Sequence, residues 1–286
     1  MTQFLSGLFV LIWATGFIVA GIVSTRADPL TFLTMRHGLS IVVFTVLSLA
    51  VKAAWPRDPK VWRHAMVAGM LLHGVYIGGV FWAVSNGLGA GMTGLVTGLH
   101  PLLTAALAIP LLHERLIARQ WIGIAVGVAG VALIVAPKIG GVEGMPLVAL
   151  FVALAATLSL TLGTIWQKRS KPEMDLRVNA AIQFVGAFAI TAPVALLTEA
   201  GRFDRSPALW GALVWAVLVL SVGGISILLV LLKHGAASKV APLLYLSPPV
   251  AALMALVLFR EPLTAVQVAG MVLAVVGAFA SRRGAG

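Results

Sequence analysis

One stretch of this sequence occurs twice, and the two copies keep the same spacing throughout. A proline, a glutamate, a glutamine and two glycines each return after 147 residues, with no insertion or deletion between them. The matching pairs are Pro101 and Pro248, Glu114 and Glu261, Gln120 and Gln267, Gly123 and Gly270, and Gly130 and Gly277. A repeat that keeps its register in this way predicts a chain made of two copies of one structural unit. We expect these units to occupy residues 1–140 and 141–286.

The composition excludes a soluble fold. Of the 286 residues, 60% are hydrophobic and 10% are charged, and the mean hydropathy is +1.04. Soluble domains average about 45–50% apolar and about 25% charged residues. The net charge of +11 would also suit a nucleic-acid-binding protein, but the basic residues lie in short loops between apolar segments, as in membrane proteins. Cysteine is absent, which excludes disulfides and thiolate metal sites. We therefore expect a lipid-embedded protein with no nucleic-acid partner, metal or cofactor.

Ten segments are long and apolar enough to cross a bilayer as helices, each of which needs about 20 residues. The expected fold is therefore an all-α membrane protein of ten transmembrane helices, arranged as two five-helix repeats. The segments cover residues 4–22, 30–51, 62–83, 90–111, 118–136, 146–166, 178–198, 208–231, 238–258 and 264–281.

The basic residues also predict the orientation. With the N-terminus inside, 14 lysines and arginines fall in inner loops and 5 in outer loops. Because inner loops of membrane proteins are the richer in these residues, we expect both termini in the cytoplasm. The first segment lacks a basic stretch before it and a small-residue cleavage site after it, which predicts a retained span and not a signal peptide.

An odd number of spans in each unit makes the second unit enter the membrane upside down relative to the first. The loop charges agree, because the turn at residues 85–91 has no basic residue whereas its repeat partner near 232–238 contains Lys233. Inverted repeats are typical of transporters, in which the substrate site lies near the midplane between the repeats. The pattern therefore favours a carrier that works by alternating access.

The sequence resembles the EamA-type branch of the drug/metabolite transporter superfamily. The resemblance rests on the segment from Trp13 to Phe17, on Arg36 in the second span, and on the paired proline, glutamate and glutamine stretches. It implies an exporter of amino acids, metabolites or drug-like compounds in the bacterial inner membrane, and the sequence is most similar to exporters of aromatic amino acids. It departs from many members at Gly16, where they have asparagine.

Polar and aromatic groups within the spans are the candidates for the substrate site, because such groups are costly in lipid, about 2.5–3.5 kcal/mol for a central Arg or Lys, and so face the protein interior. Imidazole, phenol and hydroxyl groups can hydrogen-bond an amino acid, and aromatic rings can stack on its side chain. Pro101 and Pro248 are expected at hinges of the fourth and ninth spans. The candidate substrate-binding residues are Trp13, Phe17, His73, Tyr76, Thr93, Thr97, His100, Thr157, Thr161, Trp166, Tyr245 and Ser247.

Each of these residue types also has a structural explanation. Threonines can donate to their own helix, and a lone histidine is more often satisfied in the core. Arg36 could attract a carboxylate substrate or act as a clamp on loops and helix ends, and the clamp is the interpretation we favour. Two glycine-rich seams, Gly123 to Gly130 and Gly270 to Gly277, indicate helix packing or dimerisation. A monomer and a weak homodimer both remain compatible with the sequence.

The nine acidic residues all fall in loops or at span ends, so the membrane carboxylate relay common in proton-coupled carriers is not evident. We therefore expect a facilitator of neutral and aromatic amino acids. A broader drug or metabolite exporter, with proton antiport through His73 or His100, is the alternative. Motifs for nucleotide binding, HExxH metal binding and nucleophile elbows are absent, so a membrane enzyme is the less favoured class.

Overall fold

The computed structural model of the chain describes residues 2–112, 117–139, 146–170, 174–233, 247–261 and 263–280. Glu114 and Tyr245, which the sequence singled out, lie outside these ranges. The described part is helical between its turns, and the β-type pairing found in it is an isolated bridge between Ala27 and Phe203. The predicted all-helical class is therefore confirmed.

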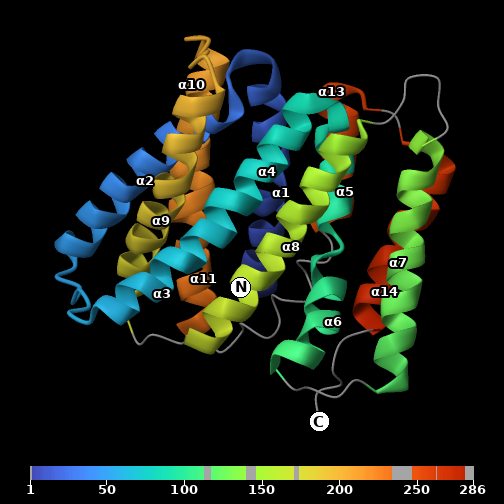
Figure 1. Cartoon of the computed structure of the whole chain (residues 1–286), viewed down its shortest axis with the longest axis horizontal. Helices are drawn as coiled ribbons and strands as arrows, with labels where there is room; N and C mark the ends of the chain where they lie inside the picture. The colour runs from blue at the N-terminus through green and yellow to red at the C-terminus, as the bar shows by residue number, and fades with distance from the viewer. Residues whose placement is uncertain are drawn as a thin grey trace.

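Within each described range the helices follow one another with short connections (Figure 1). Three segments, η1 to η3, are π-helical. In chain order the elements are α1 (Thr2–Arg26), α2 (Pro29–Ala50), α3 (Pro59–Gly69), η1 (Met70–Val75), α4 (Tyr76–Ala83), η2 (Val84–Leu88), α5 (Ala90–Thr97), α6 (His100–Leu112), α7 (Ala118–Ile139), α8 (Leu147–Ser170), α9 (Leu176–Thr198), α10 (Pro207–Val214), η3 (Trp215–Gly223), α11 (Gly224–Lys233), α13 (Ser247–Phe259) and α14 (Ala265–Ala280).

Six helical stretches within the described residues are long and apolar enough to cross a membrane. Each overlaps one of the ten predicted segments. α13 and α14 are shorter apolar helices. The six spans are Gly7–Ser24, Pro29–Ala50, Pro59–Leu88, Leu147–Lys168, Leu176–Thr198 and Pro207–Ile227.

Two of the long spans contain a π-helical segment at equivalent repeat positions. η1 covers residues 70–75, and adding the repeat distance of 147 gives 217–222, which lies inside η3. A π-helix widens the turn and shifts the side chains that follow it, and such segments are frequent at functional sites. The sequence analysis did not predict these segments, and neither of them contains a proline.

The fourth predicted span is broken into two helices. α5 ends at Thr97 and α6 begins at His100, and Gly98 and Leu99 lie between them. Pro101 has no N–H to donate and would clash with the carbonyl of Thr97 in a continuous helix. The restart at His100 places this proline in the first turn of α6, where proline is tolerated. Pro248 likewise occupies the first turn of α13.

Helices at equivalent repeat positions pack against each other. The pairs are α2 with α9, and α7 with α14, while α5 packs against α13, whose repeat equivalent is α6. α7 and α14 lie side by side in Figure 1, and their glycine seams form the contact. A Cβ on Gly277 would lie 2.4 Å from the backbone nitrogen of Gly127, and one on Gly130 would lie 2.5 Å from that of Ala274. The predicted small-residue seams thus join two helices of one chain.

One large hydrophobic cluster connects the two repeats. Its buried members include Phe17, Phe32 and Tyr76 from the first repeat, with Leu213 and Ala251 from the second. Side chains of both repeats are therefore buried against one another in this core. This arrangement brings the candidate residues of the two repeats toward a common interior.

Candidate functional site

Three of the predicted substrate-binding residues meet in the shared core. Phe17 of α1 and Tyr76 of α4 are 4% and 5% exposed. The Tyr76 hydroxyl lies within hydrogen-bonding range of Thr97 on α5. Gly94 of α5 allows its neighbours to approach closely. A Cβ at this position would lie 3.1 Å from Cβ of Ala251 on α13 and 3.6 Å from the Phe17 ring. The interior at this level is aromatic and apolar, with a phenol and a hydroxyl as its polar groups.

The predicted threonine stripes donate their hydroxyl protons to their own helices. Thr93 donates to the Gly89 carbonyl at 2.7 Å, and Thr97 donates to that of Thr93 at 2.9 Å. Thr157 and Thr161 of α8 do the same one turn back, at 2.8 and 3.0 Å. This is the structural alternative that the sequence left open. The oxygens still carry lone pairs, so they can accept hydrogen bonds but do not donate them in this arrangement.

His100 makes a polar contact between the two repeats. Its Nδ1 lies 3.0 Å from Oγ1 of Thr161 on α8. The Thr161 proton is engaged by its own helix, so His100 is the donor and its other nitrogen is left to accept. Thr104 adds its hydroxyl one turn along α6, where it donates to the His100 carbonyl at 2.8 Å. The fourth and sixth spans are thereby joined through residues that the sequence analysis had selected.

Other predicted site residues lie apart from this group. Trp13 is 40% exposed and contacts Phe9 with ring centroids 5.8 Å apart. Trp166 donates from Nε1 to the His64 carbonyl at 3.1 Å, at the start of the third span. Ser247, the first residue of α13, is buried, and its Oγ finds no hydrogen-bond partner among the described residues. Tyr245, as noted, is not described.

His73 belongs to a separate polar group around Phe184, at the contact of α2, η1 and α9. The His73 ring stacks on Phe184 with centroids 4.8 Å apart, and Gln183 lies within hydrogen-bonding range of it. The sequence analysis listed His73 among the substrate-binding candidates and missed this grouping, although Gln183 stands 147 residues after Arg36 and is its repeat partner. We name as the Arg36 cluster the residues Arg36, His37, Ser40, His73, Gln183 and Phe184.

The two repeats are also fastened at one end of the helix bundle, which we name the Glu261 end: the loops at residues 26–29, 84–90, 199–207 and 260–264. Glu261 accepts hydrogen bonds from the backbone N–H groups of Ala90 and Gly91, at 2.8 and 2.9 Å. A carboxylate at the first N–H groups of a helix satisfies donors that have no partner within the helix and complements its dipole. Glu261 therefore caps α5 from the other repeat.

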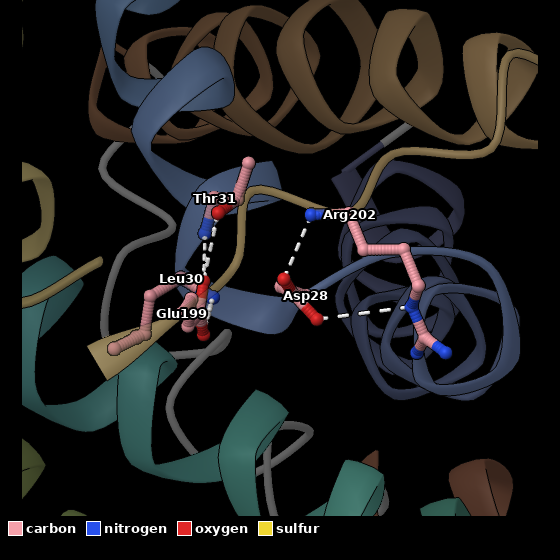
Figure 2. A network of polar contacts seen from close by, with 5 residues as sticks. All are labelled: Asp28, Leu30, Thr31, Glu199 and Arg202. Carbon is pink, nitrogen blue, oxygen red and sulfur yellow. Dashed lines mark hydrogen bonds and ion pairs between the residues drawn. The ribbon is translucent and has the colours of Figure 1, made fainter. Parts of the chain in front are cut away.

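A second carboxylate performs the same task on α2. Glu199 accepts from the N–H groups of Leu30 and Thr31 at 2.8 and 2.7 Å, and from the Thr31 hydroxyl at 2.8 Å. Next to it, Asp28 accepts from the Arg202 N–H at 2.8 Å and pairs with its side chain at 3.7 Å. Figure 2 shows these five residues joining the start of α2 to the loop after α9.

A pocket lies directly under the Glu261 cap. It is lined by the turn before α5, by Met92 and Leu95 of α5, and by Glu261, Leu263 and Gln267 of the second repeat. Gln267 also returns its Oε1 to the N–H of Thr264, at 3.0 Å, while Thr264 accepts from the Gln267 N–H at 3.2 Å. This reciprocal pair is a capping box at the start of α14. Gln120 makes the equivalent bond to Ile117, at 3.0 Å.

The repeated glutamine thus caps the first turn of the last helix in each repeat. Of the two repeated glutamates, Glu261 lies in the described residues and caps α5. Neither function requires substrate chemistry. Among the described residues, no group of three or more metal-ligating side chains is placed to hold a metal ion. The site is a helix-lined interior between the two repeats.

Comparison with known families decides the class. The model of the EamA-like transporter family matches this chain twice, over residues 2–136 and 147–283. The chain belongs to the EamA-like transporter family. As an EamA-like protein it is a multi-pass membrane transporter built on a two-repeat fold, which agrees with the family resemblance of the sequence. This membership favours transport over enzymatic chemistry.

Other EamA-like relatives match over nearly the whole chain. A probable amino-acid metabolite efflux pump of Salmonella typhimurium is 28% identical over 291 residues, which is 96% of this chain and 93% of that protein. Its Escherichia coli counterpart is 25% identical and covers 95% and 91%. An uncharacterized transporter of Bacillus subtilis, YvbV, is 25% identical and covers 96% and 89%. One solved crystal structure superposes with a TM-score of 0.69 at 21% identity, covering 98% of this chain and 95% of that one, and supports the fold.

Proposed function

We propose that this EamA-like protein exports neutral amino acids, aromatic ones above all, across the bacterial inner membrane. The observation that carries the proposal is the interior formed by Phe17, Tyr76, Thr97, His100 and Thr161, contributed by both repeats. Aromatic rings offer stacking surfaces, while the phenol, hydroxyls and imidazole offer hydrogen bonds. An amphipathic solute with one apolar and one polar end suits such a lining. Two relatives are probable amino-acid metabolite efflux pumps, which points in the same direction.

The transport cycle we propose is alternating access between ten spans arranged as two inverted repeats, residues 1–140 and 141–286. The interruption at Gly98 and Leu99, next to Pro101, supports a bend in the fourth span. Pro248 at the start of α13 is its repeat partner in the ninth. With both termini in the cytoplasm, the Glu261 end faces outward. The Glu261 and Glu199 caps then hold the outer side of the bundle together and must release when the solute leaves.

We further propose that the protein is a facilitator, driven by the gradient of its own solute. The described acids lie at helix ends or in loops, where Glu199 and Glu261 serve as caps. A membrane-embedded carboxylate that could carry protons is therefore missing from the described spans. The competing mechanism, proton antiport, would have to use His73 or His100.

The experiment is uptake of radiolabelled phenylalanine, tryptophan, leucine and lysine into proteoliposomes without an imposed ion gradient. The proposal predicts uptake of the first three and not of lysine, and a reduced rate for Tyr76→Ala. Uptake of lysine at an equal rate, or of none of the four by folded protein, would contradict the substrate assignment. Uphill uptake driven by a pH gradient and abolished in His73→Ala or His100→Ala would replace the facilitator with an antiporter.

A further inference from the structure

Arg36 is a buried cation that forms no ion pair with the described residues. It lies on α2 about 10 Å from the first residue of that helix along its axis, and 6% of its surface is exposed. Its Nε is buried without a hydrogen-bond partner in the described part of the chain. The ion pairs formed there by other arginines, Arg26, Arg177 and Arg202, all lie outside the helix interiors. A charge held in this way requires a partner that the described residues do not supply.

Arg36 is not alone in lacking a partner. Ser40, one turn along the same face of α2, is fully buried with its Oγ unbonded, and the Nδ1 of His73 and the Nε2 of His37 are buried and unbonded in the same cluster. Most serines buried in helices donate to a carbonyl of their own helix, as Ser48 does to Phe44 at 2.7 Å. The Ser40 hydroxyl does not. Four unpaired polar atoms in one cluster are more than a folded interior normally leaves.

The structural alternative for Arg36, a clamp on loops or helix ends, does not fit these contacts. A clamp needs carbonyl or carboxylate partners, and the described residues give Arg36 neither. The loop next to it is instead fastened by Glu199 and Asp28. The repeat adds an independent argument, because the second repeat builds the equivalent helix, α9, with Gln183 at this position. The α9 helix therefore packs with an uncharged residue at the position that Arg36 occupies on α2.

We propose that the Arg36 cluster is a binding site for a carboxylate. The guanidinium of Arg36 presents its donors in a planar fork that matches a carboxylate. Ser40 Oγ, one turn along α2, and His73 Nδ1 of η1 add further donors. Gln183 reaches the same histidine from the second repeat, so an anion held here contacts both repeats. Resting on the proposed function, the site receives the carboxylate end of the transported amino acid, while the apolar end faces the aromatic interior around Tyr76.

The test measures binding and not transport. Isothermal titration calorimetry on the purified full chain compares 3-phenylpropionate, which has the carboxylate but no amine, with phenethylamine, which has the amine but no carboxylate. Wild-type protein should bind the first and not the second. Arg36→Gln, which installs the residue of the repeat partner, should weaken 3-phenylpropionate binding about tenfold or more, as the loss of a charged hydrogen bond implies. Arg26→Gln removes an arginine at the Glu261 end and should leave the affinity unchanged.

Ser40→Ala is the second variant, which keeps the test valid if Arg36→Gln does not fold. It removes an unbonded hydroxyl and should weaken 3-phenylpropionate binding several-fold without loss of stability. Wild-type affinity for this ligand in Arg36→Gln and Ser40→Ala would overturn the site. Phenethylamine binding as tightly as 3-phenylpropionate in the wild-type protein would overturn it as well.

Two further arms separate the sources of the anion and the two proposals. Chloride that competes with 3-phenylpropionate in wild-type protein, but not in Arg36→Gln, would support an anion site and overturn its assignment to the solute. Carboxylate binding that depends on Arg36, in a protein that moves no amino acid, would leave the site standing and overturn the proposed function. If Arg36→Gln transported phenylalanine and bound it with unchanged affinity, the proposed function would stand and the carboxylate site would be overturned.

Discussion

The carboxylate of Glu261 accepts a hydrogen bond of 2.8 Å from the backbone N–H of Ala90, 171 residues earlier in the chain. The bond joins the end of α13 in the second repeat to the first turn of α5 in the first. Because a helix start offers several unpaired N–H groups and the positive end of its dipole, one carboxylate can hold two repeats together there. A contact of this kind can form and break as a unit when the bundle opens.

Glu261→Gln should therefore loosen the Glu261 end. The amide keeps one acceptor oxygen and loses the charge, which should cost about 1–3 kcal/mol of the closed arrangement. The chain has no cysteine, so Leu95→Cys, in the pocket under the cap, can be labelled without background. Labelling by a membrane-impermeant maleimide should rise several-fold in the Glu261→Gln variant.

The matched control for this experiment is Asp58→Asn. Asp58 caps α3 by accepting from the Lys60 N–H at 2.8 Å, within one repeat and away from the Glu261 end. Asp58→Asn removes a carboxylate charge from a helix start, as Glu261→Gln does. If Leu95→Cys were labelled equally in both variants, the rise would reflect general loosening and the cap would have no special part in closing this end.

The repeated motif illustrates what sequence could and could not predict. The repeat, the membrane class and the helix positions follow from spacing and hydropathy, which depend on local sequence. The partner of Glu261 could not be predicted, because it lies on another repeat and is reached only after folding. The Thr93 and Thr157 hydroxyls were expected on a substrate wall, yet each donates to its own helix. Periodicity identifies a face of a helix but not the bonds made there.

Glu199→Ala should destabilise the protein more than the loss of a surface ion pair does. Three donors on α2, two N–H groups and a hydroxyl, lose their acceptor together, and unsatisfied donors cost about 1–3 kcal/mol. The pair between Arg26 and Asp204 is 3.6 Å long and its side chains are 40% and 43% exposed, so Arg26→Gln should change stability by no more than about 0.5 kcal/mol. The apparent melting temperature from tryptophan fluorescence measures both. Equal shifts would argue against the Glu199 cap.

Gly277→Ala should lower the stability of the protein, whereas Gly211→Ala should not. A Cβ on Gly277 would lie 2.4 Å from backbone of α7, whereas nothing lies within 4 Å of one on Gly211. Gly277→Ala should force α7 and α14 apart at a cost of about 1–3 kcal/mol. Gly211→Ala should be neutral or stabilise α10 by about 0.5–1 kcal/mol, because alanine loses less backbone entropy. The same melting experiment decides, and a stabilising Gly277→Ala would show that the seam is not closely packed.

Thr161→Val should weaken substrate handling, since it removes the acceptor of His100 Nδ1 without changing side-chain shape. The KM for phenylalanine should rise about three- to tenfold, the range of a single neutral hydrogen bond. Thr164→Val is the matched control, because Thr164 donates to the Leu160 carbonyl at 2.8 Å in the same helix and has no histidine partner among the described contacts. Initial uptake rates give both values. An unchanged KM in Thr161→Val would separate this contact from the solute path.

The most direct test of the central claim, a carrier that alternates access to one amino-acid site, is counterflow. Proteoliposomes loaded with unlabelled phenylalanine are diluted into a trace of radiolabelled phenylalanine, and the label inside is followed over time. The account predicts a transient accumulation above the equilibrium level, which is absent from empty vesicles and recovered unchanged as phenylalanine. Uptake that never exceeds equilibrium, whatever the loading, would contradict alternating access, and a chemically altered product would contradict transport itself.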